Sequence, residues 1–261
     1  MSSALDITDV GLRFGGVAAL DGVTFSAEAG EIVGIIGPNG AGKTTLFDCI
    51  SGFRRPDRGS IRLSVPGRQP VELTTQPAHA RAGFGIGRTF QNARLFRSLP
   101  LREVVQAVQH QHMHGSGFFR SVLGTRSARS DEAAVARKAD AALDVVGLLP
   151  HADKPASELS TGMLRLCELA ALIALEPKVL LLDEPSSGIA QKETEALGPL
   201  LRSIADRLDA TVLLIEHDMP LIMSISDTIV AMAAGRTVTS GTPADVRAHP
   251  EVLQSYLGAS A

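Results

Sequence analysis

The stretch Gly37-Pro-Asn-Gly-Ala-Gly-Lys43-Thr44-Thr45 follows an apolar, β-rich run over residues 31–36 and opens a helical pattern over residues 43–51. It fits the phosphate-binding pattern GxxxxGK followed by Ser or Thr, which requires a strand before it and a helix after it. Glycines let backbone N–H groups turn toward phosphates without a Cβ in the way. The helix N-terminus adds partial positive charge. The stretch therefore predicts a nucleotide-phosphate site.

Two side chains extend this predicted site beyond the backbone. We expect Lys43 to reach the β- and γ-phosphates of a bound nucleotide, and the hydroxyl of Thr44 to ligate Mg²⁺. The nucleotide-binding residues expected in the loop are Gly37, Pro38, Asn39, Gly40, Ala41, Gly42, Lys43, Thr44 and Thr45.

A second acidic element, Asp183-Glu184-Pro185, follows the apolar run over residues 179–182. An apolar strand that ends in a carboxylate places a negative group beside the metal, so we expect Asp183 to hold Mg²⁺ through water. Glu184 then faces the γ-phosphate, where it would polarise the attacking water as general base. The two elements together predict hydrolysis of a nucleoside triphosphate.

The rest of the chain divides by pattern. The first third reads as strands and turns, whereas residues 100–155 read as a helical lobe, with one apolar helix face over residues 131–146 after a loop-like stretch at 124–130. The last third alternates apolar runs (179–182 and 211–215) with helical spacing, which indicates a parallel sheet. We expect a closing hairpin over 228–239 and a helical tail over 243–257.

Composition narrows the class of protein. The chain has 261 residues, a formal net charge of −3 and 4% aromatic residues, which argues against nucleic acid as a partner. Cys49 and Cys167 stand alone in apolar segments, and we interpret both as buried core residues. The N-terminus has no signal-peptide pattern, and no apolar run approaches the ~20 residues of a membrane span. Any membrane role would come through a partner.

Four further motifs choose among the proteins that share this phosphate loop. The segment Leu159-Ser160-Thr-Gly162-Met resembles the LSGGQ signature of ABC ATPases, and Gln91 resembles their Q-loop glutamine. His217 follows the next strand as their switch histidine does, and Phe14 resembles the aromatic residue that stacks on adenine. Because order and spacing match along nearly the whole chain, it is identified as a member of the ABC transporter ATPase family.

The resemblance implies a fold and a mechanism. The fold is a P-loop NTPase α/β core with a mainly parallel sheet, an antiparallel β subdomain and an inserted α-helical subdomain. Two ATPase subunits would face each other head to tail, with ATP between the Lys43 loop of one and the signature of the other. Ser160 and the Gly162 N–H would contact the γ-phosphate across the interface. Gln91 would bind the metal and sense the γ-phosphate, and His217 would hold the γ-phosphate and water in register.

The implied domain is a single ABC-type nucleotide-binding domain over residues 4–261. Its α/β core with the β subdomain would take residues 4–90 and 175–240. The helical subdomain would take residues 95–172, and a C-terminal helical tail residues 241–261.

The resemblance also narrows to one subfamily. The stretches at 88–96, 214–219 and 241–258 are similar to the ATPases of branched-chain amino-acid importers. They imply a subunit on the cytoplasmic face of the cell membrane that powers uptake of branched-chain amino acids or a related small solute. The implied partners are transmembrane permease subunits, a second ATPase subunit and, indirectly, an extracytoplasmic solute-binding protein. An exporter ATPase and a soluble, non-transport ABC ATPase are the alternatives.

Three residues depart from the family pattern. Thr161 stands where the signature consensus has Gly, Met163 where it has Gln, and Ala190 where most relatives have Asp or Asn. We infer an asymmetry: the ATP site formed by Lys43 and a partner's signature is competent, and the opposite site is slower. A heterodimer with a second ATPase would tolerate that asymmetry.

Overall fold

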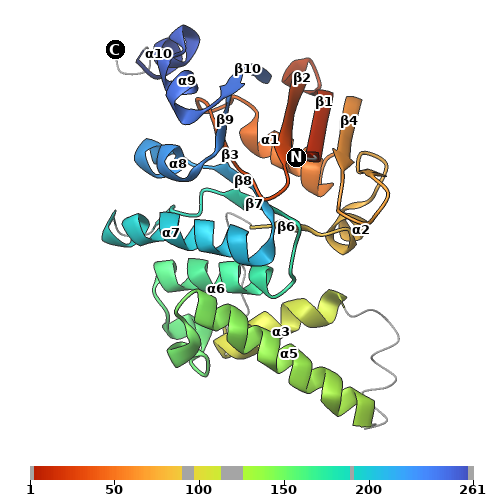
Figure 1. The fold of residues 1–261 in the computed structure, drawn as a ribbon, viewed down its shortest axis with the longest axis vertical. Helices are drawn as coiled ribbons and strands as arrows, with labels where there is room; N and C mark the ends of the chain where they lie inside the picture. The colour runs from red at the N-terminus through yellow and green to blue at the C-terminus, as the bar shows by residue number, and fades with distance from the viewer. Residues whose placement is uncertain (1–2, 90–96, 113–125, 189–190, 258–261) are drawn as a thin grey trace. The chain divides into compact units, whose positions relative to one another are not determined.

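The computed structural model describes residues 3–89, 97–112, 126–188 and 191–257 (Figure 1). They form two compact units. The first unit takes residues 1–88, 177–187 and 194–261, and the second takes residues 89–176 and 188–193. Within the described residues, no helix is long and apolar enough to cross a membrane.

One sheet of the first unit is antiparallel, with the strand order β2-β1-β4-β5. Strand β1 pairs along most of its length with the edge strand β2, and β4 pairs with the other edge of β1. Every second residue in the later half of β2 is buried, as expected of a sheet with one covered face. The strands are β1 (Ser3–Phe14), β2 (Val17–Glu28), β4 (Arg58–Leu63) and β5 (Val71–Glu72).

The other sheet of this unit is mainly parallel, with the order β10-β9-β3-β8-β7-β6. The residues of β3, β7 and β8 are buried throughout, which explains why these strands read as continuous apolar runs in the sequence. The strands are β3 (Ile32–Ile36), β6 (Ile86–Arg88), β7 (Val179–Asp183), β8 (Thr211–Ile215), β9 (Thr228–Ala233) and β10 (Arg236–Gly241).

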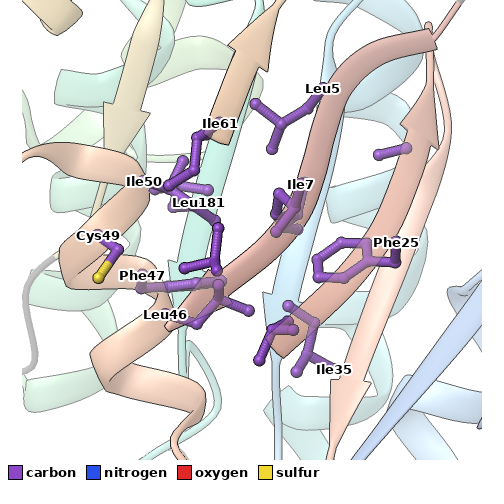
Figure 2. Close-up of a cluster of buried hydrophobic side chains, with 14 of the residues drawn as sticks. Leu5, Ile7, Phe25, Ile35, Leu46, Phe47, Cys49, Ile50, Ile61 and Leu181 are labelled. Atoms are coloured by element: carbon purple, nitrogen blue, oxygen red, sulfur yellow. The ribbon is translucent and has the colours of Figure 1, made fainter. Parts of the chain in front are cut away.

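Helix α1 (Lys43–Ser51) supplies the core that the two sheets share (Figure 2). Its apolar side chains are fully buried, and they pack with residues of β1, β2 and β4 as well as with residues of β3 and β7. The labelled members of this cluster are Leu5, Ile7, Phe25, Ile35, Leu46, Phe47, Cys49, Ile50, Ile61 and Leu181. The first helix after the phosphate loop is thereby fixed by the hydrophobic core.

The remaining helices of this unit include two that meet at a break. The helical tail expected over residues 243–257 consists of two helices, α9 (Pro243–Ala248) and α10 (Pro250–Leu257). The break falls at His249, whose backbone is extended, because the following proline disfavours the helical conformation there. The others are α2 (Ala78–Gly83), α7 (Gln191–Leu208) and α8 (Met219–Ile225).

The second unit is helical. Helices α3 (Leu101–His112), α5 (Arg126–Val145) and α6 (Thr161–Ile173) contact one another, and the short 3-10 turns Leu149–His151 and Ala156–Glu158 link α5 to α6. The predicted apolar face of α5 is confirmed, since Val135, Ala139, Ala142 and Leu143 are all buried. The loop expected before residue 131 is wrong, because α5 already begins at Arg126 and no Gly or Pro lies between them.

The order of the parallel strands creates the place for a site. Strand β8 lies between β3 and β7 and is parallel to both. The ends of these strands, at Ile36, Asp183 and Ile215, therefore meet at one edge of the sheet. Ligands of open α/β sheets bind outside the carboxyl ends of the strands, so the loops that follow these three strands define where to look.

Candidate functional site

The phosphate loop owes its shape to glycines at positive φ. Gly37 has φ 154°, Gly40 has φ 81° and Gly42 has φ 98°. A Cβ on Gly37 would lie 2.2 Å from the backbone oxygen of Met232, and one on Gly42 would lie 2.6 Å from the backbone oxygen of Ala19. A Cβ on Gly40 would meet nothing within 4 Å. The first and third glycines are thus required by close packing, and the middle one by its conformation alone.

The loop rests on the hairpin between β9 and β10. The N–H of Gly235 donates to the oxygen of Ala41 at 3.1 Å, and the oxygen of Gly235 accepts from the N–H of Asp21 at 2.8 Å. Arg236 forms an ion pair with Asp21. The predicted closing hairpin is confirmed. Its turn is hydrogen-bonded to the phosphate loop and to β2, and so holds the loop against that strand.

Lys43 is buried at the first position of α1. Its Nζ donates to the backbone oxygens of Gly37 at 2.7 Å and Pro38 at 3.1 Å, so the side chain curls over its own loop. Burial lowers the pKa of Lys43, and the charges of Glu184 and Asp183 oppose that effect. The ammonium therefore lies in the electrostatic reach of both carboxylates that the sequence paired with it.

Asp183 ends β7 and is only 2% exposed. Burial raises the pKa of this carboxyl group, and the positive charge of Arg88, 3.6 Å away between Nη2 and Oδ2, acts in the opposite direction. The same guanidinium donates to Asp48 Oδ1 at 2.7 Å and to Ser51 Oγ at 2.9 Å, both on α1. Arg88 thus ties the acidic end of β7 to the helix that follows the phosphate loop.

Glu184 and His217 form a pair on neighbouring loops. His217 Nε2 lies 3.0 Å from Glu184 Oε1, within hydrogen-bond distance. The N–H of Glu184 donates to the oxygen of Ile215 at 2.9 Å, and Glu184 adopts a positive φ of 51°. Such a conformation is rare for a residue with a Cβ and concentrates at functional sites. The pair presents a partly exposed carboxylate next to an exposed imidazole, which suits proton transfer.

The signature segment begins α6 in the second unit. Ser160 is the N-cap of that helix, and its Oγ accepts from the N–H of Met163 at 3.3 Å. Ser160 and Thr161 are exposed, and Gly162 is half-buried. The exposed hydroxyl and the first turn of the helix form an anion-attracting end.

The structure brings together only some of the site residues predicted from the sequence. Lys43, Asp183, Glu184 and His217 come together at the edge of the mainly parallel sheet. Phe14 ends β1 and is 45% exposed, with the guanidinium of Arg54 5.2 Å from its ring centroid. Gln91 and Ala190 lie outside the described residues.

Two residues that the sequence analysis did not single out belong to this neighbourhood. They are Arg88 and Glu216. Glu216 is 3% exposed, and its carboxylate accepts from the backbone N–H groups of Ser186 and His217. A charged residue directly after the apolar run over residues 212–215 is the sequence signal that points to Glu216.

The donor chemistry of the site fits ATP with Mg²⁺. Mg²⁺ prefers oxygen ligands and is usually held by one or two carboxylates together with substrate phosphates. Thr44 offers an exposed hydroxyl next to Lys43, and Asp183 offers a carboxylate. The described residues contain no cluster of three or more His, Cys, Asp or Glu side chains for a metal. One hydroxyl and one carboxylate suit a metal that takes its remaining ligands from phosphate and water.

The fold and this site define a class of protein, and comparisons agree. The family model described as ABC transporter matches residues 20–187. The solved structure of the ADP conformation of MJ1267, an ATP-binding cassette of an ABC transporter, matches with a TM-score of 0.83 and 26% identity, over 99% of this chain and 100% of that one. The chain belongs to the ABC transporter family and is an ABC transporter ATPase.

Closer relatives place it among the branched-chain amino acid transporter ATPases. It is 39% identical over 254 residues, 97% of each chain, to the high-affinity branched-chain amino acid transport ATP-binding protein LivG of Escherichia coli. It is equally similar, over the same share of each chain, to BraF of Pseudomonas aeruginosa, which carries the same description. A model described as branched-chain amino acid ATP-binding cassette transporter matches residues 236–261. The family and subfamily inferred from the motifs are confirmed.

Proposed function

We propose that this chain hydrolyses ATP to drive uptake of branched-chain amino acids, or of a related small solute, through a membrane permease. The observation that carries the proposal is similarity along 97% of both chains to two proteins described as acting in branched-chain amino acid transport. The match of residues 236–261 to a model of the same description supports it independently of the phosphate loop.

The residues of the first unit supply the hydrolytic chemistry. Lys43 and the backbone N–H groups of the loop bind the β- and γ-phosphates. Glu184 accepts a proton from water as the water oxygen bonds to the γ-phosphorus, and the bond from that phosphorus to the β–γ bridging oxygen breaks to release ADP and phosphate. His217, 3.0 Å from Glu184, would hold the γ-phosphate and the attacking water in register. Phe14 is exposed and offers its ring to adenine.

Thr44, Asp183 and Gln91 would hold Mg²⁺, which when bound neutralises charge on the phosphates. Ser160 and the Gly162 N–H would contact the γ-phosphate bound by a second ATPase subunit, because a helix N-terminus with an exposed hydroxyl favours an anion. The chain would act as one nucleotide-binding domain in a complex with two permease subunits, at the cytoplasmic face of the cell membrane. A solute-binding protein outside the cell would deliver the solute.

The departures at Thr161, Met163 and Ala190 favour a second ATPase of different sequence over a homodimer. Purified alone, the chain is then expected to hydrolyse ATP more slowly than the complete complex. Cooperative hydrolysis by the isolated chain at the rate of the complex would exclude the heterodimer.

The decisive experiment combines partner capture with transport. The tagged chain is purified from gently solubilised native membranes, and copurifying proteins are identified by mass spectrometry. Two permease-like proteins with a second ATPase are expected. Uptake of radiolabelled leucine is then compared in cells carrying the wild-type chain or Glu184→Gln, which is expected to abolish it. ATP-dependent efflux would favour an exporter, and recovery only from the soluble fraction would leave the ATPase without a transport role.

A further inference from the structure

Glu216 is a buried acidic residue, and burying a carboxylate costs free energy unless it is hydrogen-bonded. It directly follows the apolar strand β8 and is 3% exposed. A carboxylate removed from water is tolerated when hydrogen bonds satisfy both of its oxygens. The partners of Glu216 therefore show what the residue is for.

Its two oxygens reach two different loops. Oε1 accepts from the N–H of Ser186 at 2.7 Å, in the loop after β7. Oε2 accepts from the N–H of His217 at 3.0 Å and, at the longer distance of 3.5 Å, from the N–H of Asp218, both in the loop after β8. Hydrogen bonds that involve an ionised acceptor are stronger than neutral ones. One side chain thus joins the two loops through their backbones.

These are the loops that carry the Glu184–His217 pair. Glu184 lies two residues before Ser186 and holds a left-handed backbone conformation, which persists only where the surroundings fix it. His217 is the residue directly after Glu216. The 3.0 Å separation of His217 Nε2 and Glu184 Oε1 therefore depends on how the loops are spaced, and Glu216 fixes that spacing on both sides.

We infer that Glu216 is a positioning residue for ATP hydrolysis, which holds the Glu184 loop and His217 in register through its buried carboxylate. The inference rests on the roles proposed above for Glu184 and His217. A carboxylate is suited to the task because each oxygen accepts and neither donates. Glutamine keeps the size but offers one acceptor oxygen, and its NH₂ group would meet a backbone N–H on the other side.

The neighbouring residue Asp218 shows that the adjacent acid has a separate task. Its Oδ1 accepts from the N–H of Leu221 at 2.9 Å and caps helix α8. Among the residues that the structure describes, its side chain bonds to α8 and not to the Glu184 loop, so Asp218→Ala removes an acid and a helix cap of the same segment while leaving the link through Glu216 intact. It is the matched control for a general weakening of this region.

The test compares Glu216→Gln, Glu216→Ala and Asp218→Ala in steady-state ATP hydrolysis, in binding of a fluorescent ATP analogue and in thermal unfolding. We expect kcat to fall about 10- to 100-fold in both Glu216 variants, the effect of one or two lost charge-assisted hydrogen bonds on the transition state. Analogue affinity is expected to change less than about twofold. Asp218→Ala is expected to lower Tm with nearly normal kcat. Glu216→Gln keeps the side-chain volume, so it reports on hydrolysis if Glu216→Ala does not fold.

A double-mutant comparison shows whether Glu216 acts through Glu184. If it does, adding Glu216→Gln to Glu184→Gln lowers the residual rate no further, because residues that act as a unit are not additive. Normal kcat in Glu216→Gln, or equal losses in kcat and analogue binding, would overturn the inference about Glu216. The proposed mechanism would still hold in that case if Glu184→Gln abolishes hydrolysis. Full turnover in Glu184→Gln would instead remove the mechanism itself.

Discussion

The two helix ends that the family motifs assign to phosphate are built differently. Helix α1 starts from Gly42, whose backbone is left-handed and which offers no side chain as a cap. Helix α6 starts from Ser160, whose backbone is extended and whose hydroxyl accepts from Met163. The first end leaves its N–H groups to a ligand and adds Lys43, whereas the second already satisfies one N–H itself. This difference fits the proposal that the α1 end is the primary phosphate site and that the α6 end makes a supplementary contact.

The largest effect is expected from Glu184→Gln, which removes the proposed general base near the α1 end and leaves the α6 end unchanged. Loss of the general base should lower kcat about 100- to 10,000-fold, while ATP binding persists because the side-chain shape is kept. Phosphate release and fluorescent-analogue binding measure the two effects. Glu195→Gln, an exposed acid on α7, is the control. Turnover within threefold of wild type would take Glu184 out of the base role.

Lys43→Ala tests the α1 end directly. Removal of a buried ammonium that would bind two phosphates is expected to weaken ATP affinity about 10- to 100-fold, from loss of charge-assisted hydrogen bonds. Titration with a fluorescent ATP analogue measures it, and exposed Lys154→Ala in the second unit is the matched control. Equal affinities in the two variants would mean that the backbone N–H groups alone bind the phosphates.

Ser160→Ala tests the α6 end and should act on two observables. Loss of the N-cap bond to Met163 is expected to cost about 1 kcal/mol of unfolding free energy. ATP affinity of the isolated chain should stay unchanged, because the proposed contact is made to a partner subunit's nucleotide. Denaturant unfolding and analogue binding give the two values. A large loss of affinity in the isolated chain would place Ser160 in its own nucleotide site.

The smallest expected effect is that of Thr161→Gly, which restores the signature consensus. In the complete transporter we expect ATP turnover to rise about two- to threefold, the equivalent of roughly 0.5 kcal/mol of barrier. The cost is a slightly less stable α6, since Gly disfavours helix by up to about 1 kcal/mol. Turnover that stays flat while Tm falls would show that Thr161 does not limit the signature end.

Most of the fold could be predicted from local sequence patterns. The phosphate loop, the apolar strands β7 and β8 and the apolar face of α5 each occupy one short stretch, so periodicity and glycine spacing were enough to predict them. The pattern over residues 243–257 predicts helix but does not mark the break at His249, where the following Pro250 disfavours the helical backbone.

The supporting contacts of the site escaped prediction for a different reason. Arg88 meets Asp48 and Asp183 from positions 40 and 95 residues away in the chain, and Glu216 meets Ser186 across 30 residues. Neither pairing leaves a local pattern, since it arises only when β6, β7 and β8 lie side by side. The motif residues could be named from the sequence, and the residues that hold them could not.

The burial of Cys49 and Cys167 has a practical consequence for following the chain at work. Both cysteines are buried. Burial raises the pKa of both thiols to about 12, so the reactive thiolate is a trace species at neutral pH. Thiol-reactive maleimide and nitroxide reagents should therefore not label the native chain. A single Thr161→Cys change then places one spectroscopic label at the start of α6 in an otherwise wild-type background, where its signal reports the approach of a partner subunit.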